Sequence, residues 1–595
     1  MRPRRHEPGI LVFDYALLPH EFRRRFLPPN LAPSDWQQLE KAFTALENRE
    51  IRSRKELEEW LGDESELSAA IFEEAAVRYV RMTTQTENKD YEKAYLDFVE
   101  IVQPKATERE FLLDRKYVGC RFRSELRKDY YFVIDRRKEN NVSLFRNENL
   151  ELEKQDAKLG QQYYKVTGAM TVQFEGQERT MQYMRRYLEE PDRGLRQRAW
   201  EASEARRLRE REKLEQVFDD LVKVRHRIAV NAGFENYRDY AFRKKERFEY
   251  TSEDALSFHD AVEESFVPLA REIYQKQRER LGIDTLRPWD IFADPEGKRP
   301  LHPFNSAEDL VRGCIKVHES ISPDLAKQFK RLRDLNLLDL ESRPGKAPGG
   351  YNYELSEVRL PFIFTNAVGR DDDVYTLLHE SGHAFHTFAT RESGLLFGYR
   401  GESIPSEFAE VASTTMEFIG GEHLSGVFYD EGDAARSMRS HLSDMVRLMG
   451  WVATIDSFQQ WVYTHPDHSR EERSDFWVGV QERYGVGESW EGYEEARESY
   501  WQRQLHLFEV PFYYIEYNIA AVGAINLWLR YRKDPKDAVE AYRESLSLGG
   551  SKPIPELFEA AGISWDFGSG MVERYAKELR RVLTSLDEAK IPMKG

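Results

Sequence analysis

Cysteine is scarce in this chain of 595 residues, which contains only Cys120 and Cys314. They are too far apart in the sequence to form a metal-type or redox-type pair, and a chain without a disulfide framework is typical of a reducing compartment. Long apolar runs are also missing. The run after the basic N-terminus is only Ile10-Leu-Val-Phe13, which is too short for a signal peptide, and no run approaches the length of a membrane span. These absences predict a cytoplasmic protein.

Positive charge is in deficit as well. With 88 Lys and Arg against 105 Asp and Glu, the formal net charge is −17. An acidic surface argues against nucleic acid and anionic membranes as partners. The hydrophobic fraction of 40% is nevertheless enough for a large core. The oligomeric state cannot be read from these features.

Helical periodicity dominates what is present. Apolar residues recur at intervals of three and four over residues 35–115 and 193–245, which predicts amphipathic helices. Pro and Gly cluster at 288–303 and 344–350, where we expect loops. The second cluster precedes two short segments rich in β-branched and aromatic residues, at 351–355 and 358–366. They predict short strands, and Pro361 within the second favours an edge strand.

The most informative segment follows these strands and contains His379-Glu380-Ser-Gly-His383. On a helix, residues four apart lie on one face, so both imidazoles can bind one metal ion while Glu380 acts on a metal-activated water. Three aspartates at 371–373 supply N-cap candidates and negative charge at the helix start. Gly382 weakens a helix, so we expect it to permit close approach of another backbone or side chain. The pattern is typical of zinc hydrolases that cleave peptide bonds.

A catalytic zinc site needs a third protein ligand. Ala389 stands where a metzincin has its third His, so that class is excluded. The downstream segment 403–421 predicts a helix, with Ser403 or Ser406 as its cap and a Gly pair at its end. Three glutamates, Glu407, Glu410 and Glu417, fall close to one face of this helix, and spacing alone does not choose among them.

The motif and the string Glu410-Val-Ala-Ser-Thr together resemble the thimet oligopeptidase and oligoendopeptidase F family of zinc metallopeptidases. The resemblance covers roughly the last 400 residues. It implies that Glu410 is the third ligand, with Glu402 and Glu407 as weaker alternatives. It also implies that Glu417 orients a ligand histidine through a hydrogen bond, without binding the metal itself. His386 could face the metal, but we expect it to take part in helix packing instead.

A second constellation lies at 506–520, where His506 precedes Tyr513, Tyr514 and Tyr517. Such aromatic residues are often simply core. In the family that the chain resembles, a wall of His and Tyr faces the zinc. The resemblance implies that His506 and Tyr514 or Tyr517 stabilise the oxyanion, and that Tyr513 binds substrate. Which tyrosine acts stays open.

The resemblance further implies a mainly helical fold, a two-lobed ellipsoid with a deep substrate channel and a small β element beside the metal helix. We expect an N-terminal helical region at 1–190 and a catalytic domain at 191–595. The strand segment 361–369, with Asn366, is expected to bind extended peptide.

The predicted function is a zinc endopeptidase for short peptides, with one Zn²⁺ per chain and Glu380 as general base. Two alternatives stay open: a carboxypeptidase that trims peptides, and an inert helical peptide-binding protein. Cobalt or manganese could replace zinc, because N/O sites accept several divalent ions.

Overall fold

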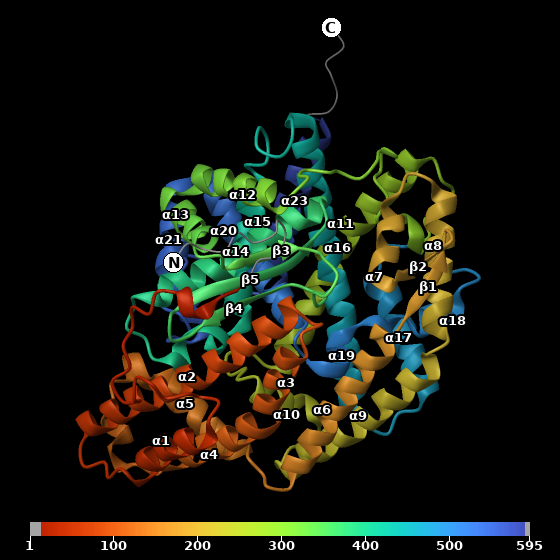
Figure 1. Cartoon of the computed structure of the whole chain (residues 1–595). Coiled ribbons are helices and arrows are strands. Elements are labelled where there is room, and N and C mark those ends of the chain that lie inside the picture. Colours follow the sequence, from red (N-terminus) through yellow and green to blue (C-terminus); the bar gives the residue numbers. More distant parts are fainter. Residues whose placement is uncertain (1–12, 589–595) are drawn as a thin grey trace. The chain divides into compact units, whose positions relative to one another are not determined.

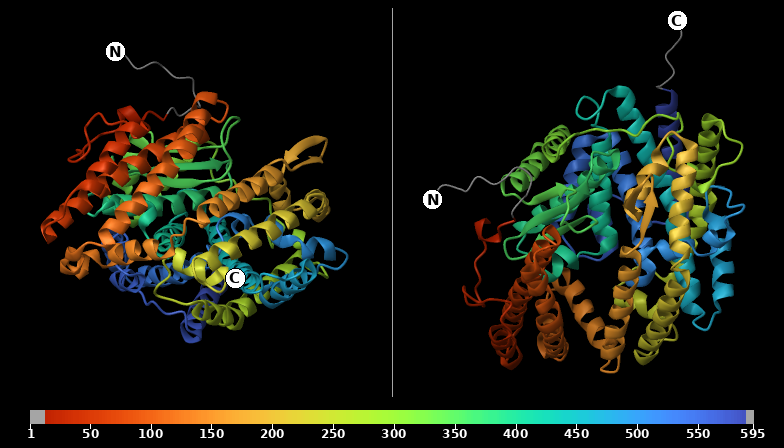
Figure 2. Two further views of the ribbon diagram at one scale, coloured as in Figure 1. Left: turned by 90° about the horizontal axis from the view of Figure 1, so that it is seen from below. Right: turned by 45° about the vertical axis from the view of Figure 1, so that its right-hand side comes forward.

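Helices make up 69% of the chain, and only small sheets accompany them. The computed structural model describes residues 13–588 (Figures 1 and 2). The predicted mainly helical fold is therefore confirmed. The chain forms two compact units, each assembled from three stretches: unit 1 from 13–143, 302–434 and 523–565, and unit 2 from 144–301, 435–522 and 566–588. The expected division at residue 190 stays a prediction.

Unit 1 consists of helices and one small sheet. Its helices and helical turns are η1 (Tyr15–Leu17), α1 (Trp36–Asn48), α2 (Arg54–Thr84), α3 (Lys89–Asp97), η2 (Phe98–Val102), α4 (Gln103–Val118), η3 (Arg121–Glu125), α5 (Lys128–Leu144), α12 (Ala307–Ile321), α13 (Pro323–Asp334), α14 (Asp371–Arg391), η6 (Phe397–Tyr399), η7 (Gly401–Ser403), α15 (Ser406–Gly421), α21 (Pro535–Ser547) and α22 (Ile554–Ala560). Its strands are β3 (Leu338–Glu341), β4 (Tyr351–Leu355) and β5 (Leu360–Ala367).

Unit 2 is built from helices and one hairpin. Its helices and helical turns are α6 (Asn149–Gly168), α7 (Met181–Met184), η4 (Arg185–Glu189), α8 (Arg193–Leu208), α9 (Arg211–Asn231), α10 (Tyr237–Lys244), α11 (Ser252–Leu281), η5 (Pro288–Asp290), α17 (Arg470–Tyr484), α18 (Glu494–Glu498), η8 (Tyr500–Arg503), α19 (Leu505–Glu509) and α23 (Ser569–Glu588). The hairpin pairs β1 (Thr171–Phe174) with β2 (Gln177–Thr180). Two helices run from one unit into the other: α16 (Glu431–Thr464) and α20 (Ile515–Lys533).

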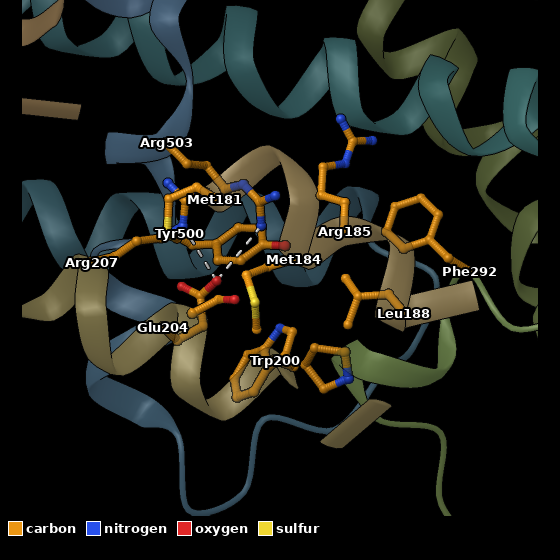
Figure 3. Close-up of a pocket in the computed structure, with 12 residues that line it drawn as sticks. Met181, Met184, Arg185, Leu188, Trp200, Glu204, Arg207, Phe292, Tyr500 and Arg503 are labelled. Carbon is orange, nitrogen blue, oxygen red and sulfur yellow. Dashed lines mark ion pairs between the residues drawn. The ribbon is translucent and has the colours of Figure 1, made fainter. Parts of the chain in front are cut away.

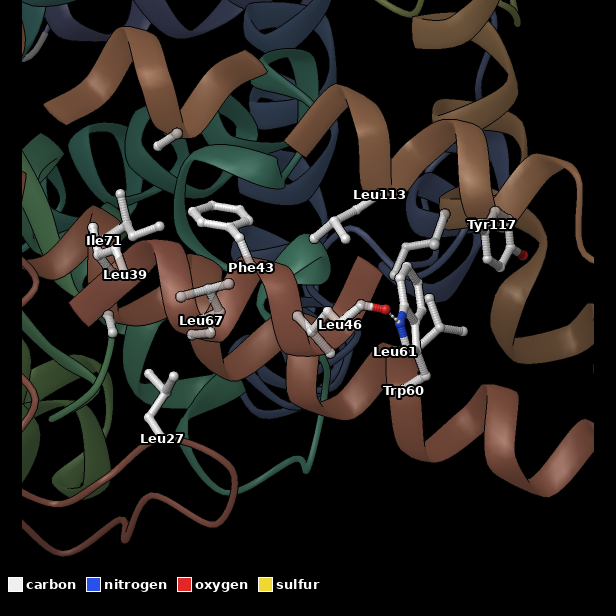
Figure 4. Close-up of a cluster of buried hydrophobic side chains, with 14 of the residues drawn as sticks. Leu27, Leu39, Phe43, Leu46, Trp60, Leu61, Leu67, Ile71, Leu113 and Tyr117 are labelled. Carbon is white, nitrogen blue, oxygen red and sulfur yellow. Dashed lines mark hydrogen bonds between the residues drawn. The ribbon is translucent and has the colours of Figure 1, made fainter. Parts of the chain in front are cut away.

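The helices expected over residues 35–115 are confirmed as α1 to α4. Side chains cap the first two, since Asp35 accepts from the backbone of Gln37 and Ser53 accepts from Glu56. Their apolar faces form one buried cluster with α4 (Figure 4). Within it the indole of Trp60 donates to the backbone oxygen of Leu46 at 3.0 Å, so its polar atom is satisfied in the core. No helix of the described part of the chain is both long and apolar enough to cross a membrane.

Strand β5 is central in the small sheet, whose order is β3-β5-β4. The expectation of an edge strand around Pro361 was therefore wrong for the strand as a whole. Proline is nevertheless tolerated at this position of β5, for a reason that lies in the local strand pairing. Pro361 pairs with Glu354 of β4, whereas the ladder to β3 begins only at Ile363. At Pro361 the strand has one neighbour, so the missing N–H breaks no second ladder.

Helices α14 and α15 occur where the sequence predicts them, although their caps differ. Arg370 is the N-cap of α14, and the aspartates form its first turn. The carboxylate of Asp373 accepts from the backbone N–H groups of Val368 and Arg370, each at 2.8 Å, and so ties the helix start to the end of β5. Helix α15 begins after Pro405 without a side-chain cap, so the expected capping by Ser403 or Ser406 was wrong.

Glycines from both helices allow α14 and α15 to touch. A Cβ atom at Gly382 would lie 2.4 Å from the backbone oxygen of Ala412 and 2.5 Å from Cα of Ser413. A Cβ atom at Gly420 would lie 2.7 Å from a methyl group of Leu378. Real Cβ atoms do not approach so closely, and at Gly382 the neighbours are backbone atoms, so any larger residue there forces the helices apart. The predicted close approach at Gly382 is confirmed.

We predict that Gly382→Ala destabilises the protein, although alanine is the better helix former. The methyl group meets backbone atoms, which cannot move aside as a side-chain tip does, and overpacking of this kind costs about 1–3 kcal/mol. The midpoint of thermal unfolding should fall. Gly62→Ala is the matched control, because nothing lies within 4 Å of a Cβ atom at that position of α2. It should raise the midpoint, as expected for Gly→Ala in a helix. Equal behaviour of the two variants would contradict the packing argument.

Candidate metal centre

The motif histidines and a glutamate from the neighbouring helix converge in unit 1. Nε2 of His379 lies 3.3 Å, and Nε2 of His383 3.7 Å, from the same carboxylate oxygen of Glu410. Ligand atoms of the three residues all lie within 4.8 Å of one another, as a common metal ion requires. The two imidazole side chains are 25% and 21% exposed, so a water and a substrate group can reach them.

A carboxylate orients the first of these imidazoles. Nδ1 of His379 donates to Glu417 at 2.7 Å, so Nε2 is the ring nitrogen directed toward Glu410. Glu417 stands two helical turns after Glu410, so α15 presents both carboxylates to α14. Backing of a ligand imidazole by a carboxylate is a common feature of zinc sites. The role of Glu417 in orienting a metal ligand stays a prediction.

Two of these three groups are unprotonated near pH 7, and His379 has to lose a proton before it can bind a metal ion. Burial alone would raise the pKa of Glu410, but the hydrogen bond to His379 and the charges of both histidines hold it at about 2. Burial lowers the pKa of His383 to about 4, so this imidazole is neutral near pH 7. The pKa of His379 is raised well above its usual value, since its contacts with Glu410 and Glu417 outweigh burial. A carboxylate and two nitrogens of this kind fit a divalent metal ion.

Ser413 is a contact that the sequence reasoning did not assign. Its hydroxyl donates to Glu410 at 2.8 Å, and it also bonds the backbone oxygen of Glu410. The residue lies three positions after Glu410 on α15, and a hydroxyl at that spacing can reach the carboxylate. The Glu-x-x-Ser pattern therefore has a physical meaning here: the serine restricts the orientation of the candidate ligand.

Glu380 lies beside the three ligand candidates and outside their set. It is 8% exposed, and burial raises the pKa of its carboxyl to about 7. Its oxygen Oε2 has no hydrogen-bond partner among the residues that the structure describes. The Asn352 amide donates to the backbone oxygen of Glu380 at 3.1 Å and so fixes this turn of α14 to strand β4. Glu380 is thus an unpaired acid–base group with a firmly held backbone.

The remaining candidates of the metal helix and its neighbours lie outside the ligand group. His386 is 3% exposed, packs against the ring of Phe408 at 5.7 Å, and has its pKa lowered to about 3 by burial. Its packing role agrees with the expectation. Glu402 lies on η7 and Glu407 in the first turn of α15; neither belongs to the set of residues whose ligand atoms converge.

His506 and the tyrosines come together in unit 2. The centre of the His506 ring lies 5.8 Å from that of Tyr513, 4.7 Å from that of Tyr514 and 6.2 Å from that of Tyr517. Tyr513 and Tyr514 precede α20, whereas Tyr517 lies in its first turn. The cluster that the sequence suggests is therefore formed, and a further residue, Gln504, contacts both His506 and Tyr514. Their roles toward substrate stay predictions.

Asn366 has a local role near the end of β5. Its amide donates to the backbone oxygens of Ala347 at 2.9 Å and Gly349 at 2.8 Å. These bonds hold the Pro/Gly-rich loop that precedes β4. The amide N–H groups of Asn366 therefore already have partners. Its proposed contact with substrate stays a prediction.

Comparisons with known proteins extend the picture to the whole chain. A model of peptidase family M3 matches residues 186–576, and a model of the peptidase M3 N-terminal domain matches residues 26–145. The chain is 22% identical over 342 residues to oligopeptidase PepF of Bacillus subtilis, and 24% identical over 305 residues to an oligoendopeptidase F homolog of Lactococcus lactis. These alignments cover 55% and 50% of this chain and 49% of each relative, so the chain spans about half the length of the curated relatives it matches.

Solved structures match almost from end to end. A structure of PZ peptidase A with inhibitor 2 has a TM-score of 0.85 and 29% identity, and the match covers 96% of this chain and 99% of that one. Oligoendopeptidase F from Enterococcus faecium has a TM-score of 0.63 at 15% identity, over 93% of this chain and 97% of that one, which shows the shared fold alone. With the family model covering well over half of its residues, this chain belongs to peptidase family M3.

Proposed function

We propose that the protein is a zinc-dependent oligopeptidase that cleaves short peptides internally. The observation that carries the proposal is the convergence of His379, His383 and Glu410 on one point, with Glu380 unpaired beside it. Membership of peptidase family M3 supports it, as does the likeness to relatives named oligopeptidase and oligoendopeptidase. One zinc ion per chain would be held by Nε2 of both histidines and by the Glu410 carboxylate.

Each of the chain's own groups has a separate proposed role in peptide hydrolysis. Zinc, when bound, supplies Lewis acidity toward the scissile carbonyl and the attacking water. Glu380 takes the proton from this water and later delivers it to the leaving amine. Glu417 holds His379 in the tautomer that presents Nε2. His506 and the tyrosines Tyr513, Tyr514 and Tyr517 are proposed to donate hydrogen bonds to the oxyanion or to the substrate backbone.

Glu380→Gln should separate chemistry from metal binding. The amide cannot accept the proton of the attacking water, so hydrolysis of a fluorogenic short peptide should fall about a hundredfold to ten-thousandfold. Zinc content, measured by elemental analysis, should stay at one per chain, because Glu380 is no ligand. His379→Ala is the matched variant in the same turn and should lose the zinc. Peptide hydrolysis that survives Glu380→Gln would refute the proposed mechanism.

Glu417→Gln should weaken metal binding without abolishing it. The amide oxygen can still accept from Nδ1 of His379, but it carries no charge, and loss of such a backing carboxylate lowers metal affinity about tenfold to a hundredfold. Competition with a chelator measures the zinc dissociation constant. Glu392→Gln serves as the control, since this exposed residue caps the C-terminal end of the same helix and pairs with Arg391 at 3.3 Å. If both variants bind zinc as tightly as the parent, Glu417 does not tune the site.

The cleavage mode can be read from products. Incubated with peptides of graded length, an endopeptidase gives pairs of internal fragments, whereas C-terminal trimming gives a ladder of single-residue losses. We expect internal fragments, an upper limit of substrate length and no cleavage in the presence of a chelator. Mass spectrometry distinguishes the cases. A ladder would favour the carboxypeptidase alternative, and intact peptides with zinc-loaded protein would favour a peptide-binding protein.

A further inference from the structure

We propose that Gln504 is a positioning residue that locks His506 into the neutral tautomer with its proton on Nε2. His506 then serves as a fixed hydrogen-bond donor and cannot act as a proton acceptor through that atom. The use of this donor on a peptide substrate rests on the proposed function; the tautomer itself rests only on contacts within unit 2.

The orientation of the Gln504 amide follows from its neighbours. Its oxygen Oε1 lies 3.3 Å from Nε1 of Trp451 and 3.3 Å from the hydroxyl of Tyr514. An indole N–H can only donate, so the atom that faces it must be the amide oxygen. A flipped amide would set its NH₂ group against the indole N–H. Trp451 therefore decides which end of the Gln504 side chain is oxygen.

The other end of the amide determines the tautomer of His506. Nε2 of Gln504 lies 2.7 Å from Nδ1 of His506. Because the NH₂ group only donates, Nδ1 must accept, and an accepting Nδ1 carries no proton. In a neutral imidazole the proton must then be on Nε2. The chain of contacts runs from Trp451 and Tyr514, which also hydrogen-bond each other, through Gln504 to His506.

The charges around His506 keep the ring neutral. Burial, together with the charge of Lys245, lowers its pKa to about 4, while the charge of Glu516 opposes the shift. Lys245 and Glu516 lie 3.3 Å apart, and Glu516 also pairs with Arg247 at 2.7 Å. Glu516 is thus held by two cations. Burial and the charge of Lys245 outweigh its effect, so the imidazole is neutral at neutral pH.

The segment that carries Gln504 is firmly held. Gln504 directly follows η8, whose Arg503 lies 3.9 Å from Glu204 of α8, while Arg207 lies 3.6 Å from the same carboxyl group. Figure 3 shows these side chains around a pocket of unit 2, with the ring of Tyr500 beneath Arg503, 4.5 Å from its guanidinium. After His506, the ring of Phe508 stacks on Tyr163 at 4.0 Å. These contacts on both sides hold Gln504 and His506 in fixed positions relative to each other.

The chemical consequence is a donor that needs no proton rearrangement during the reaction. Among the described residues nothing hydrogen-bonds to Nε2 of His506, and the residue is half-buried. A preorganised N–H of this kind suits an oxyanion or a peptide carbonyl. The same lock removes His506 from general base catalysis through Nε2, which leaves that role to Glu380. Gln504 itself acts only through His506.

The tautomer can be measured directly in the zinc-loaded full-length enzyme. Long-range ¹H–¹⁵N spectra of a sample labelled with [¹⁵N]histidine distinguish protonated from unprotonated ring nitrogens, and His506→Gln assigns the signals. We expect a protonated Nε2 and an unprotonated Nδ1 from pH 6 to 9. A proton on Nδ1, or a charged ring at neutral pH, overturns the proposal whether or not the enzyme hydrolyses peptides. The result is therefore independent of the Glu380→Gln test of the proposed function.

Gln504→Glu should reverse the tautomer of His506. Its carboxylate accepts where the amide donates, so it moves the proton to Nδ1 and raises the pKa of His506. Below that pKa the charged ring keeps its Nε2–H; above it Nε2 is bare. Activity should therefore fall as pH rises through the new pKa, with a loss in kcat of about a hundredfold, as for removal of one oxyanion donor, and little change in KM.

Two further variants separate this effect from simple structural damage. Gln504→Leu removes the lock without inverting it, so its kcat should lie between those of the parent and Gln504→Glu, without the new pH dependence. Gln161→Glu adds the same charge at an exposed position of α6 and should behave like the parent. Equal, pH-independent losses in the Glu and Leu variants would show a merely structural role for Gln504 and overturn the proposal.

Discussion

The contact between α14 and α15 is the constraint on which the candidate centre depends. The backbone of Ala412 and Ser413 lies against Gly382, inside the motif itself, and no side chain larger than hydrogen fits between. This approach brings Glu410 to both imidazoles and Glu417 to the far side of His379. Since the reach of a glutamate side chain is short, a wider helix spacing would separate the ligands. The close packing of α14 against α15 and the meeting of the candidate ligands therefore depend on the same contact.

The sheet and the loops before it hold this helix pair in place. Strand β4 bonds to the backbone of Glu380 through Asn352, and Asp373 joins the start of α14 to the end of β5. The hydroxyl of Tyr542 on α21 donates at 2.9 Å to the backbone oxygen of Ala412, the same oxygen that lies against Gly382. Each bond restrains a helix that carries candidate ligands, and the bond from Tyr542 also satisfies a buried polar group.

Two imidazoles with opposite duties show how one side chain is set to different tasks by its neighbours. A carboxylate accepts from Nδ1 of His379, so Nε2 is the nitrogen available for the proposed metal ligation once its proton is lost. An amide donates to Nδ1 of His506 and so leaves the proton on Nε2, as hydrogen-bond donation requires. The difference between Glu417 and Gln504 is one of charge and donor capacity, not of shape.

Apolar periodicity in the sequence determined the helical class. Spacing along one helix determined the two motif histidines, Glu380 and the need for a close neighbour at Gly382, because these features depend on residues of the same helix. Spacing alone left three glutamates open. Only the tertiary structure places Glu410 against the histidines, puts β5 at the centre of its sheet, and joins Gln504 to Trp451 and His506. Such contacts join residues from different helices and strands, and one-dimensional patterns do not encode which faces will meet.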